Sequence, residues 1–123
     1  MVIVDTDVII AAIRGNDIAR QLIRRYRSSA CISVVTEMEL YVGATNKRKR
    51  ESVELVLKEH EVIPLDKSIC EIALRLIKTN NTAHSSLFLP DALIAATCLH
   101  EHCALVTFNT KDFAIVKGLQ IAG

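Results

Sequence analysis

Short apolar runs alternate with longer segments that have the apolar spacing of helices, and this alternation constrains the fold of the chain. Two of the clearest runs are VIV at 2–4 and ALVTF at 104–108. Continuous β-branched runs of this length are typical of strands buried on both faces of a parallel sheet. Further strands are expected at 30–35, 61–65 and 119–121. Strands that alternate with helices predict an α/β fold with a parallel sheet.

The composition agrees with an aliphatic core. Of the 123 residues, 50% are hydrophobic but only 4% are aromatic, and Trp is absent. A chain of this length is expected to form a single domain over residues 1–123. The formal net charge of +1 excludes binding of nucleic acid through the overall charge, so any such binding must use local basic clusters.

Cysteine usage and the apolar segments indicate the compartment. The four Cys residues are far apart and form no CxxC pair, which is typical of reduced thiols in the cytosol. The opening MVIV is too short for a signal peptide, and ALIAATCL at 92–99 is too short to span a bilayer. We therefore expect a cytoplasmic protein without a membrane segment.

Four acids stand just after expected strands or at expected helix starts: Asp5, Glu39, Asp91 and Asp112. Three of them have structural explanations. Glu39 completes a capping box with Thr36, Asp91 complements a helix N-terminus, and Asp112 suits a turn. Asp5 directly follows a buried strand, so it needs a partner or a cleft. Carboxylates gathered at strand ends repel one another unless a cation neutralises them, and an all-oxygen site suits Mg²⁺ or Mn²⁺.

Four segments together resemble the PIN-domain nucleases, most closely the VapC-type toxins of toxin–antitoxin pairs. They are VDTDVII at 4–10, SVVTEMELYVGA at 33–44, LPDALIAAT at 89–97 and LVTFNTKDF at 105–113. The resemblance covers nearly the whole chain. It implies a PIN-like domain with three α/β/α layers and a central parallel sheet of about five strands. It also implies a metal-dependent endoribonuclease that acts as a toxin.

The resemblance makes the four acids the catalytic quartet around the metal. Asp5 and Asp91 would ligate Mg²⁺ or Mn²⁺ directly, and Glu39 and Asp112 would complete the shell through water or a second ion. Such an ion lowers the pKa of water and neutralises charge on the phosphate oxygens. The expected products carry a 5′-phosphate and a 3′-hydroxyl.

Three polar neighbours of the quartet receive separate roles. Thr6 and Asn109 match positions that support the site in the family. Asp7 is a departure, because the family often has Asn or Ser there. We expect Asp7 to cap the helix that follows the first strand, and to add charge near the metal.

Basic residues cluster at 20–27 and 46–50. Charge runs usually form a solvated helix face, but in a nuclease they would contact phosphates and make binding salt-dependent. The candidate RNA-binding residues are Lys47, Arg48, Lys49 and Arg50. The resemblance further implies an RNA substrate, for which tRNA is common in the family, a VapB-like antitoxin that covers the acidic site, and a homodimer.

Three other functions fit parts of the sequence. Asp5 and Asp7 match the Asp-x-Asp motif of phosphatases of the haloacid-dehalogenase class, with Asp5 as nucleophile and Asp7 as general acid. Asp66 after an apolar run resembles the phospho-accepting Asp of a receiver module. A PIN domain that has lost catalysis and serves as an interaction module is the third.

Overall fold

Strands and helices alternate along the chain, and the computed structural model describes residues 1–122. In that range the sheet consists of β1 (Val2–Val4), β2 (Ala30–Ser33), β3 (Glu61–Ile63), β4 (Ala104–Val106) and β5 (Ile121–Ala122). The helices are α1 (Thr6–Ile13), α2 (Asp17–Arg25), α3 (Val34–Gly43), α4 (Lys47–Lys58), α5 (Lys67–Asn80), α6 (Leu89–Glu101) and α7 (Thr110–Phe113). All strand pairs are parallel, which confirms the α/β class.

The strand order β3-β2-β1-β4-β5 places β1 in the middle of the sheet. The first crossovers lead from β1 toward β2 and β3, whereas the later strands β4 and β5 lie on the other side of β1. The strand order therefore reverses between β1 and β4. Ligands in open α/β sheets bind beyond the carboxyl ends of the strands at such a reversal, so the residues after β1 and β4 mark the expected site.

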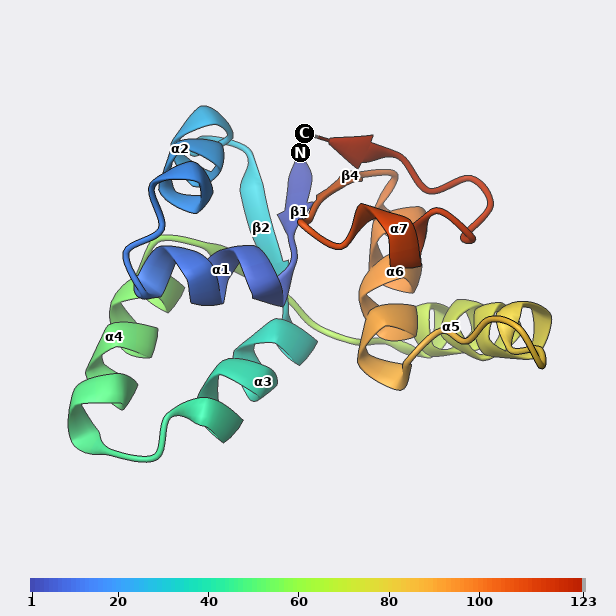
Figure 1. The fold of residues 1–123 in the computed structure, drawn as a ribbon, viewed down its shortest axis with the longest axis horizontal. Coiled ribbons are helices and arrows are strands. Elements are labelled where there is room, and N and C mark those ends of the chain that lie inside the picture. The colour runs from blue at the N-terminus through green and yellow to red at the C-terminus, as the bar shows by residue number, and fades with distance from the viewer. Residues whose placement is uncertain (123) are drawn as a thin grey trace.

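Each face of the sheet carries its own hydrophobic cluster. Along β1, Val2 and Val4 point into one cluster and Ile3 into the other, as the alternation of a strand requires. α1, α2 and α4 pack on the face of Val2 and Val4, and α5 and α6 pack on the face of Ile3. Figure 1 shows these two groups of helices on opposite sides of the strands. The expected three-layer α/β/α arrangement is confirmed.

Helix α3 begins earlier than the sequence predicted. The second strand ends at Ser33, and Ser33 is the N-cap of α3, its hydroxyl accepting a hydrogen bond from the Val35 amide at 3.0 Å. The predicted capping box between Thr36 and Glu39 is therefore wrong, because Thr36 already lies inside the helix and is fully buried. Glu39 consequently owes its position to something other than capping.

The observed ends of other elements differ from the predicted ones by a few residues. The strand expected at 61–65 ends at Ile63, just before Pro64, and lies at the edge of the sheet, where proline is tolerated. The strand expected at 104–108 ends at Val106, and the last strand begins at Ile121 rather than at 119. The longest connection between helices runs from α5, which ends at Asn80, to α6, which begins at Leu89. No helix within residues 1–122 has the length and apolarity needed to cross a membrane.

Candidate active site

The four predicted acids come from four segments that meet beyond the carboxyl ends of β1, β2 and β4. Asp5 follows β1 directly and is 5% exposed. Glu39 lies in the second turn of α3, and Asp91 lies in the first turn of α6. Both are half-buried, whereas Asp112 in α7 is exposed. The acids therefore range from a buried carboxylate at the end of the central strand to one at the surface.

Asp5 is held at both of its carboxylate oxygens. Its Oδ1 accepts a hydrogen bond from the Thr6 amide at 2.8 Å, and its Oδ2 accepts one from the Thr107 hydroxyl at 2.7 Å. Asp5 is also the N-cap of α1, with the extended backbone that an N-cap adopts (φ −69°, ψ 155°). The carboxylate is thus fixed by the helix that follows it and by the residue that follows β4.

A chain of hydroxyl groups fixes Glu39. The Thr6 hydroxyl donates to Glu39 Oε1 at 2.8 Å, and the hydroxyls of Thr6 and Thr36 are also 2.8 Å apart. Because a hydroxyl has one hydrogen to donate, Thr36 must be the donor to Thr6. Thr36, which sequence reasoning treated as a cap, therefore holds the Thr6 hydroxyl from the buried side of α3, and Thr6 in turn contacts Glu39.

Thr107 and Asn109 connect Asp112 to Asp5. The Asn109 side-chain amide donates to Asp112 Oδ2 at 2.8 Å, and the Asn109 backbone amide donates to the Thr107 hydroxyl at 2.9 Å. That same hydroxyl donates to Asp5. Sequence reasoning found Asn109 but missed Thr107. The available signal was a hydroxyl residue directly after an apolar strand, at the carboxyl ends of the strands, where Asp5 also lies.

Asp7 does not cap α1, which corrects the prediction from sequence. It lies inside the first turn of the helix, and its Oδ2 accepts a hydrogen bond from the Phe108 backbone amide at 3.2 Å. Its Oδ1 is buried and has no hydrogen-bond partner among residues 1–122. Asp7 therefore ties α1 to the segment after β4 and leaves one carboxylate oxygen unused.

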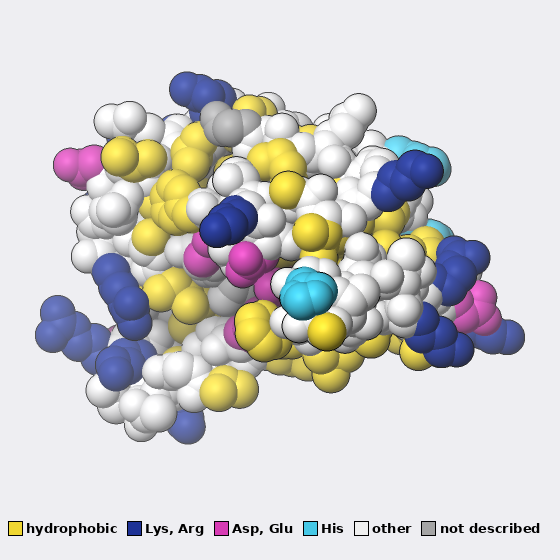
Figure 2. All heavy atoms as spheres, turned by 45° about the vertical axis from the view of Figure 1, so that its right-hand side comes forward, with side chains coloured by type: hydrophobic (Ala, Val, Ile, Leu, Met, Phe, Trp, Pro, Cys, Tyr) yellow, Lys and Arg dark blue, Asp and Glu magenta, His cyan; other side chains and the backbone are white. Residues whose placement is uncertain are grey.

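The acids influence one another electrostatically. Burial, together with the negative charges of Asp7 and Asp91, raises the pKa of Asp5 to about 7 against the opposing hydrogen bonds from Thr107 and Thr6. Burial also raises the pKa of Asp91, with further contributions from Glu39, Asp112 and Asp7. The structure thus brings all four predicted acids together, with Asp7 as a fifth. Figure 2 shows magenta acidic side chains gathered in a hollow of one face.

The excess negative charge has no basic counterpart in the ion pairs observed within residues 1–122. They include Lys67–Glu71 and the contact of His100 with Glu101, which is ionic only when the imidazole is protonated, and neither includes one of the five acids. A bound cation would relieve the repulsion, and the all-oxygen donor set suits Mg²⁺ or Mn²⁺.

The acids do not form a closed ligand cage. Over the described range 1–122, no three His, Cys, Asp or Glu side chains stand close enough together to hold a metal ion among themselves. This arrangement fits Mg²⁺, which keeps several waters and usually takes only one or two carboxylates directly. Asp5 and Asp91 are the buried and half-buried members available for direct contact.

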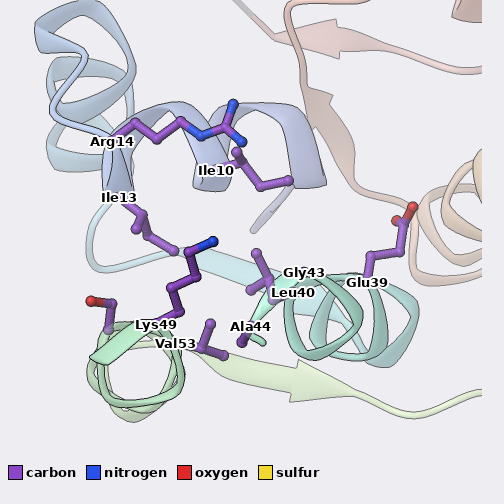
Figure 3. A pocket seen from close by; sticks show the side chains of 10 residues that line it. Ile10, Ile13, Arg14, Glu39, Leu40, Gly43, Ala44, Lys49 and Val53 are labelled. Carbon is purple, nitrogen blue, oxygen red and sulfur yellow. The ribbon is translucent and has the colours of Figure 1, made fainter. Parts of the chain in front are cut away.

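A cavity of about 230 Å³ lies between α1, α3 and α4, with Glu39 on its wall. Figure 3 shows the long side chains of Arg14 and Lys49 reaching over an apolar floor that includes Leu40 and Val53. Lys49 belongs to the basic residues of the first turn of α4, all of them exposed. The basic turn and the acidic hollow are therefore connected by a partly apolar groove.

The receiver alternative disagrees with the structure. Asp66 is the N-cap of α5, and its Oδ1 accepts a hydrogen bond from the Ile69 amide at 2.8 Å. It follows the edge strand β3, and the strand order differs from the 2-1-3-4-5 order of the receiver fold.

Comparison with known proteins decides the family. The model of the PIN domain family matches residues 2–119. The chain belongs to the PIN-domain family. This PIN domain is 32% identical over 122 residues to ribonuclease VapC10 of Mycobacterium tuberculosis, which covers 98% of this chain and 91% of that protein. It is 29% identical over 126 residues to ribonuclease VapC1 of Rickettsia felis, with 97% and 92% covered.

A solved structure agrees with the sequence relatives. A toxin–antitoxin complex from Klebsiella pneumoniae superposes with a TM-score of 0.83 at 30% identity, covering 97% of this chain and 95% of that one. The predicted resemblance to VapC-type PIN nucleases is confirmed: the chain belongs to the PIN-domain family and is similar to proteins named VapC ribonucleases. The phosphatase and receiver alternatives are thereby overturned.

Proposed function

We propose that this PIN domain is a Mg²⁺- or Mn²⁺-dependent endoribonuclease and the toxin of a VapBC-type pair. The observation that carries the metal dependence is the gathering of acids around the buried Asp5, where burial and, to a smaller extent, the charges of neighbouring acids raise the pKa of both Asp5 and Asp91. The VapC relatives are named ribonucleases, which supports RNA as the substrate. The intact set of acids favours an active enzyme over an interaction module.

Asp5 and Asp91 would hold the cation directly, and Glu39 and Asp112 would reach it through water or a second ion. The cation supplies Lewis acidity, which activates water and neutralises charge on the phosphate oxygens. Thr6 and Thr107 fix both oxygens of Asp5 before any ligand arrives. Preorganised carboxylates of this kind contribute to catalysis through positioning rather than covalent chemistry.

The remaining contacts orient the outer acids. The hydroxyl of Thr6 aims Glu39, and the amide of Asn109 aims Asp112. Both donors bind a carboxylate oxygen at 2.8 Å, so each acid keeps its other oxygen for water. In this scheme Thr6 and Asn109 act as positioning residues for Glu39 and Asp112.

An RNase assay with purified protein tests the proposal. We expect cleavage of structured RNA, with tRNA as the first substrate, in Mg²⁺ or Mn²⁺ but not in EDTA. Asp5→Asn and Asp91→Asn should each lower the rate at least about 100-fold, because each removes a direct ligand. Asp17→Asn, in the first turn of α2, is the matched control and should cleave like the wild type. Equal activity in all four proteins would contradict the assignment.

A VapB-like antitoxin is the proposed partner, and the matched Klebsiella pneumoniae structure is a toxin–antitoxin complex. We propose that a segment of the antitoxin covers the acidic site, that the chain forms a homodimer, and that the pair acts in the cytoplasm. The neighbouring reading frame should encode a protein that co-purifies with this chain and abolishes its RNase activity. Light scattering of the free chain at twice the monomer mass would support the homodimer.

A further inference from the structure

A large aromatic side chain stands exposed beside the acidic site. Phe88 is 67% exposed, whereas Phe113 is 1% exposed in the core. Phe88 directly precedes α6, three residues before Asp91. An exposed Phe at this place has no packing role of its own that would explain it.

The structure around Phe88 fixes its outward orientation. The neighbouring Leu87 is 3% exposed, and its amide donates to Asn81 Oδ1 at 2.6 Å, which anchors the end of the loop in the core. Phe88 is the N-cap of α6 but makes no side-chain capping hydrogen bond, and only its carbonyl accepts from the Ala92 amide. The start of α6 therefore uses only the backbone of Phe88, and the phenyl ring is exposed at the surface.

Phe88 lines a cavity of about 510 Å³ that reaches Asp112. This Phe88 cavity also contains the cationic Lys111, His84 and several hydroxyl groups. Its loop is built as a turn in which Thr82 Oγ1 accepts from the amides of His84 and Ser85, both at 3.2 Å. Figure 2 shows a histidine and hydrophobic side chains beside the magenta acids on this face. The cavity thus joins an aromatic surface and a positive charge to one of the proposed catalytic acids.

We propose that the Phe88 cavity is a nucleotide subsite, where one unstacked RNA base next to the cleaved bond stacks on Phe88 and its phosphate contacts Lys111. The inference rests on the proposed ribonuclease function. Single-stranded RNA is recognised by stacking of splayed bases on aromatic rings, and its phosphates by Lys or Arg. The volume lies in the range of small-ligand pockets. The combination of ring, cation and hydroxyls matches a nucleotide better than an apolar peptide segment.

Binding of RNA in EDTA separates this subsite from catalysis. The probe is a single-stranded RNA with 2-aminopurine beside the mapped cleavage position, whose fluorescence is quenched on stacking. Phe88→Ala should weaken binding at least about fivefold and abolish the quenching, whereas Phe88→Tyr should preserve both. Lys111→Ala should weaken binding and lower the salt dependence by about one phosphate contact. Leu55→Ala is the control, because Leu55 is 64% exposed on α4, away from this cavity.

An abasic RNA distinguishes stacking from general damage. If the base stacks on Phe88, removal of that base should eliminate the difference between the wild type and Phe88→Ala. An equal loss of binding to both RNAs, or no loss at all while the wild type cleaves RNA, overturns the subsite and leaves the ribonuclease function standing. A Phe88→Ala protein that cleaves normally but no longer binds the antitoxin would assign Phe88 to the protein interface instead. Failure of the wild type to bind and to cleave any RNA would overturn both proposals.

Discussion

At the residue scale, the buried position of Asp5 conflicts with its negative charge when no cation is bound. Asp5 caps α1 and ends the central strand, so it is buried, and burial raises its pKa to about 7. An acid whose folded pKa lies above its unfolded value stabilises the fold fully at low pH, and this stabilisation is lost as the pH rises through the folded pKa. The metal-free protein should therefore lose stability between about pH 4 and about pH 7.

Asp5→Asn should remove this pH dependence. The amide keeps an oxygen for the Thr6 amide but carries no charge, so the metal-free variant should be more stable than the wild type at pH 8. The expected difference in the free energy of unfolding is on the order of 2–4 kcal/mol, since one unit of pKa corresponds to about 1.4 kcal/mol. Denaturant unfolding in EDTA at pH 5 and pH 8 measures it, with Asp17→Asn as control. A wild type that is as stable at pH 8 as at pH 5 would contradict the prediction.

The residues of the site were only partly predictable from sequence. Asp5, Glu39, Asp91 and Asp112 follow from strand ends and from the resemblance, and the structure brings them together. Asp5 and Asp7 are equally good caps by residue type, and only the extended backbone at Asp5 decides between them. Bonds across long sequence separations, such as Thr107 to Asp5, depend on which strands are neighbours, which no local pattern contains.

At the scale of elements, the first turn of α4 has the wrong charge for a helix start. Lys47, Arg48, Lys49 and Arg50 occupy it, and no acid is present in that turn. Cations near a helix N-terminus are unfavourable by about 0.3–1 kcal/mol each. Acids at these positions would stabilise the helix better. The presence of basic residues instead supports a role for this turn in contacting RNA phosphates.

The double variant Lys47→Glu/Arg48→Glu should therefore raise stability while it weakens RNA binding. Both side chains are exposed, and the variant spares Arg50, whose Nε donates to the Ala44 carbonyl at 3.3 Å. We expect a gain of about 0.5–1 kcal/mol in unfolding free energy and a flatter salt dependence of RNA binding. Lys58→Glu, at the other end of the same helix, is the control and should destabilise without affecting RNA. Unchanged RNA affinity in the double variant would show that this turn is only a solvated helix face and does not contact RNA.

Element boundaries show the same limit of local patterns. Ser33 and Thr36 are both good N-caps, and the sequence favoured Thr36 because Glu39 follows at the capping-box spacing. The structure begins the helix at Val34, which buries the Thr36 hydroxyl where it can reach Thr6. The tertiary contact with α1 therefore outweighed the local capping pattern, and the element order was still predicted correctly.

At the scale of the whole molecule, the acidic site lies between two separately packed layers. Asp5 and Asp7 are carried by the start of α1, whose apolar side chains belong to one cluster. Asp91 and Asp112 are carried by α6 and α7, whose buried residues belong to the other. Repulsion among these acids acts across the junction of the layers, and a shared cation would bridge it.

Cation binding should therefore tighten both layers at once. Hydrogen exchange measured with and without Mg²⁺ should show slower exchange in the first turns of α1 and α6 together. The global stability should rise by RT ln(1 + [Mg²⁺]/Kd), about 2.7 kcal/mol at a hundredfold excess over Kd. Asp91→Asn should lose the protection in both helices, although the substituted residue belongs to only one of them, because the bridge needs a ligand from each layer. Mg²⁺-dependent protection confined to α6 in the wild type, or retained at α1 in Asp91→Asn, would show that the cation is held by one layer alone.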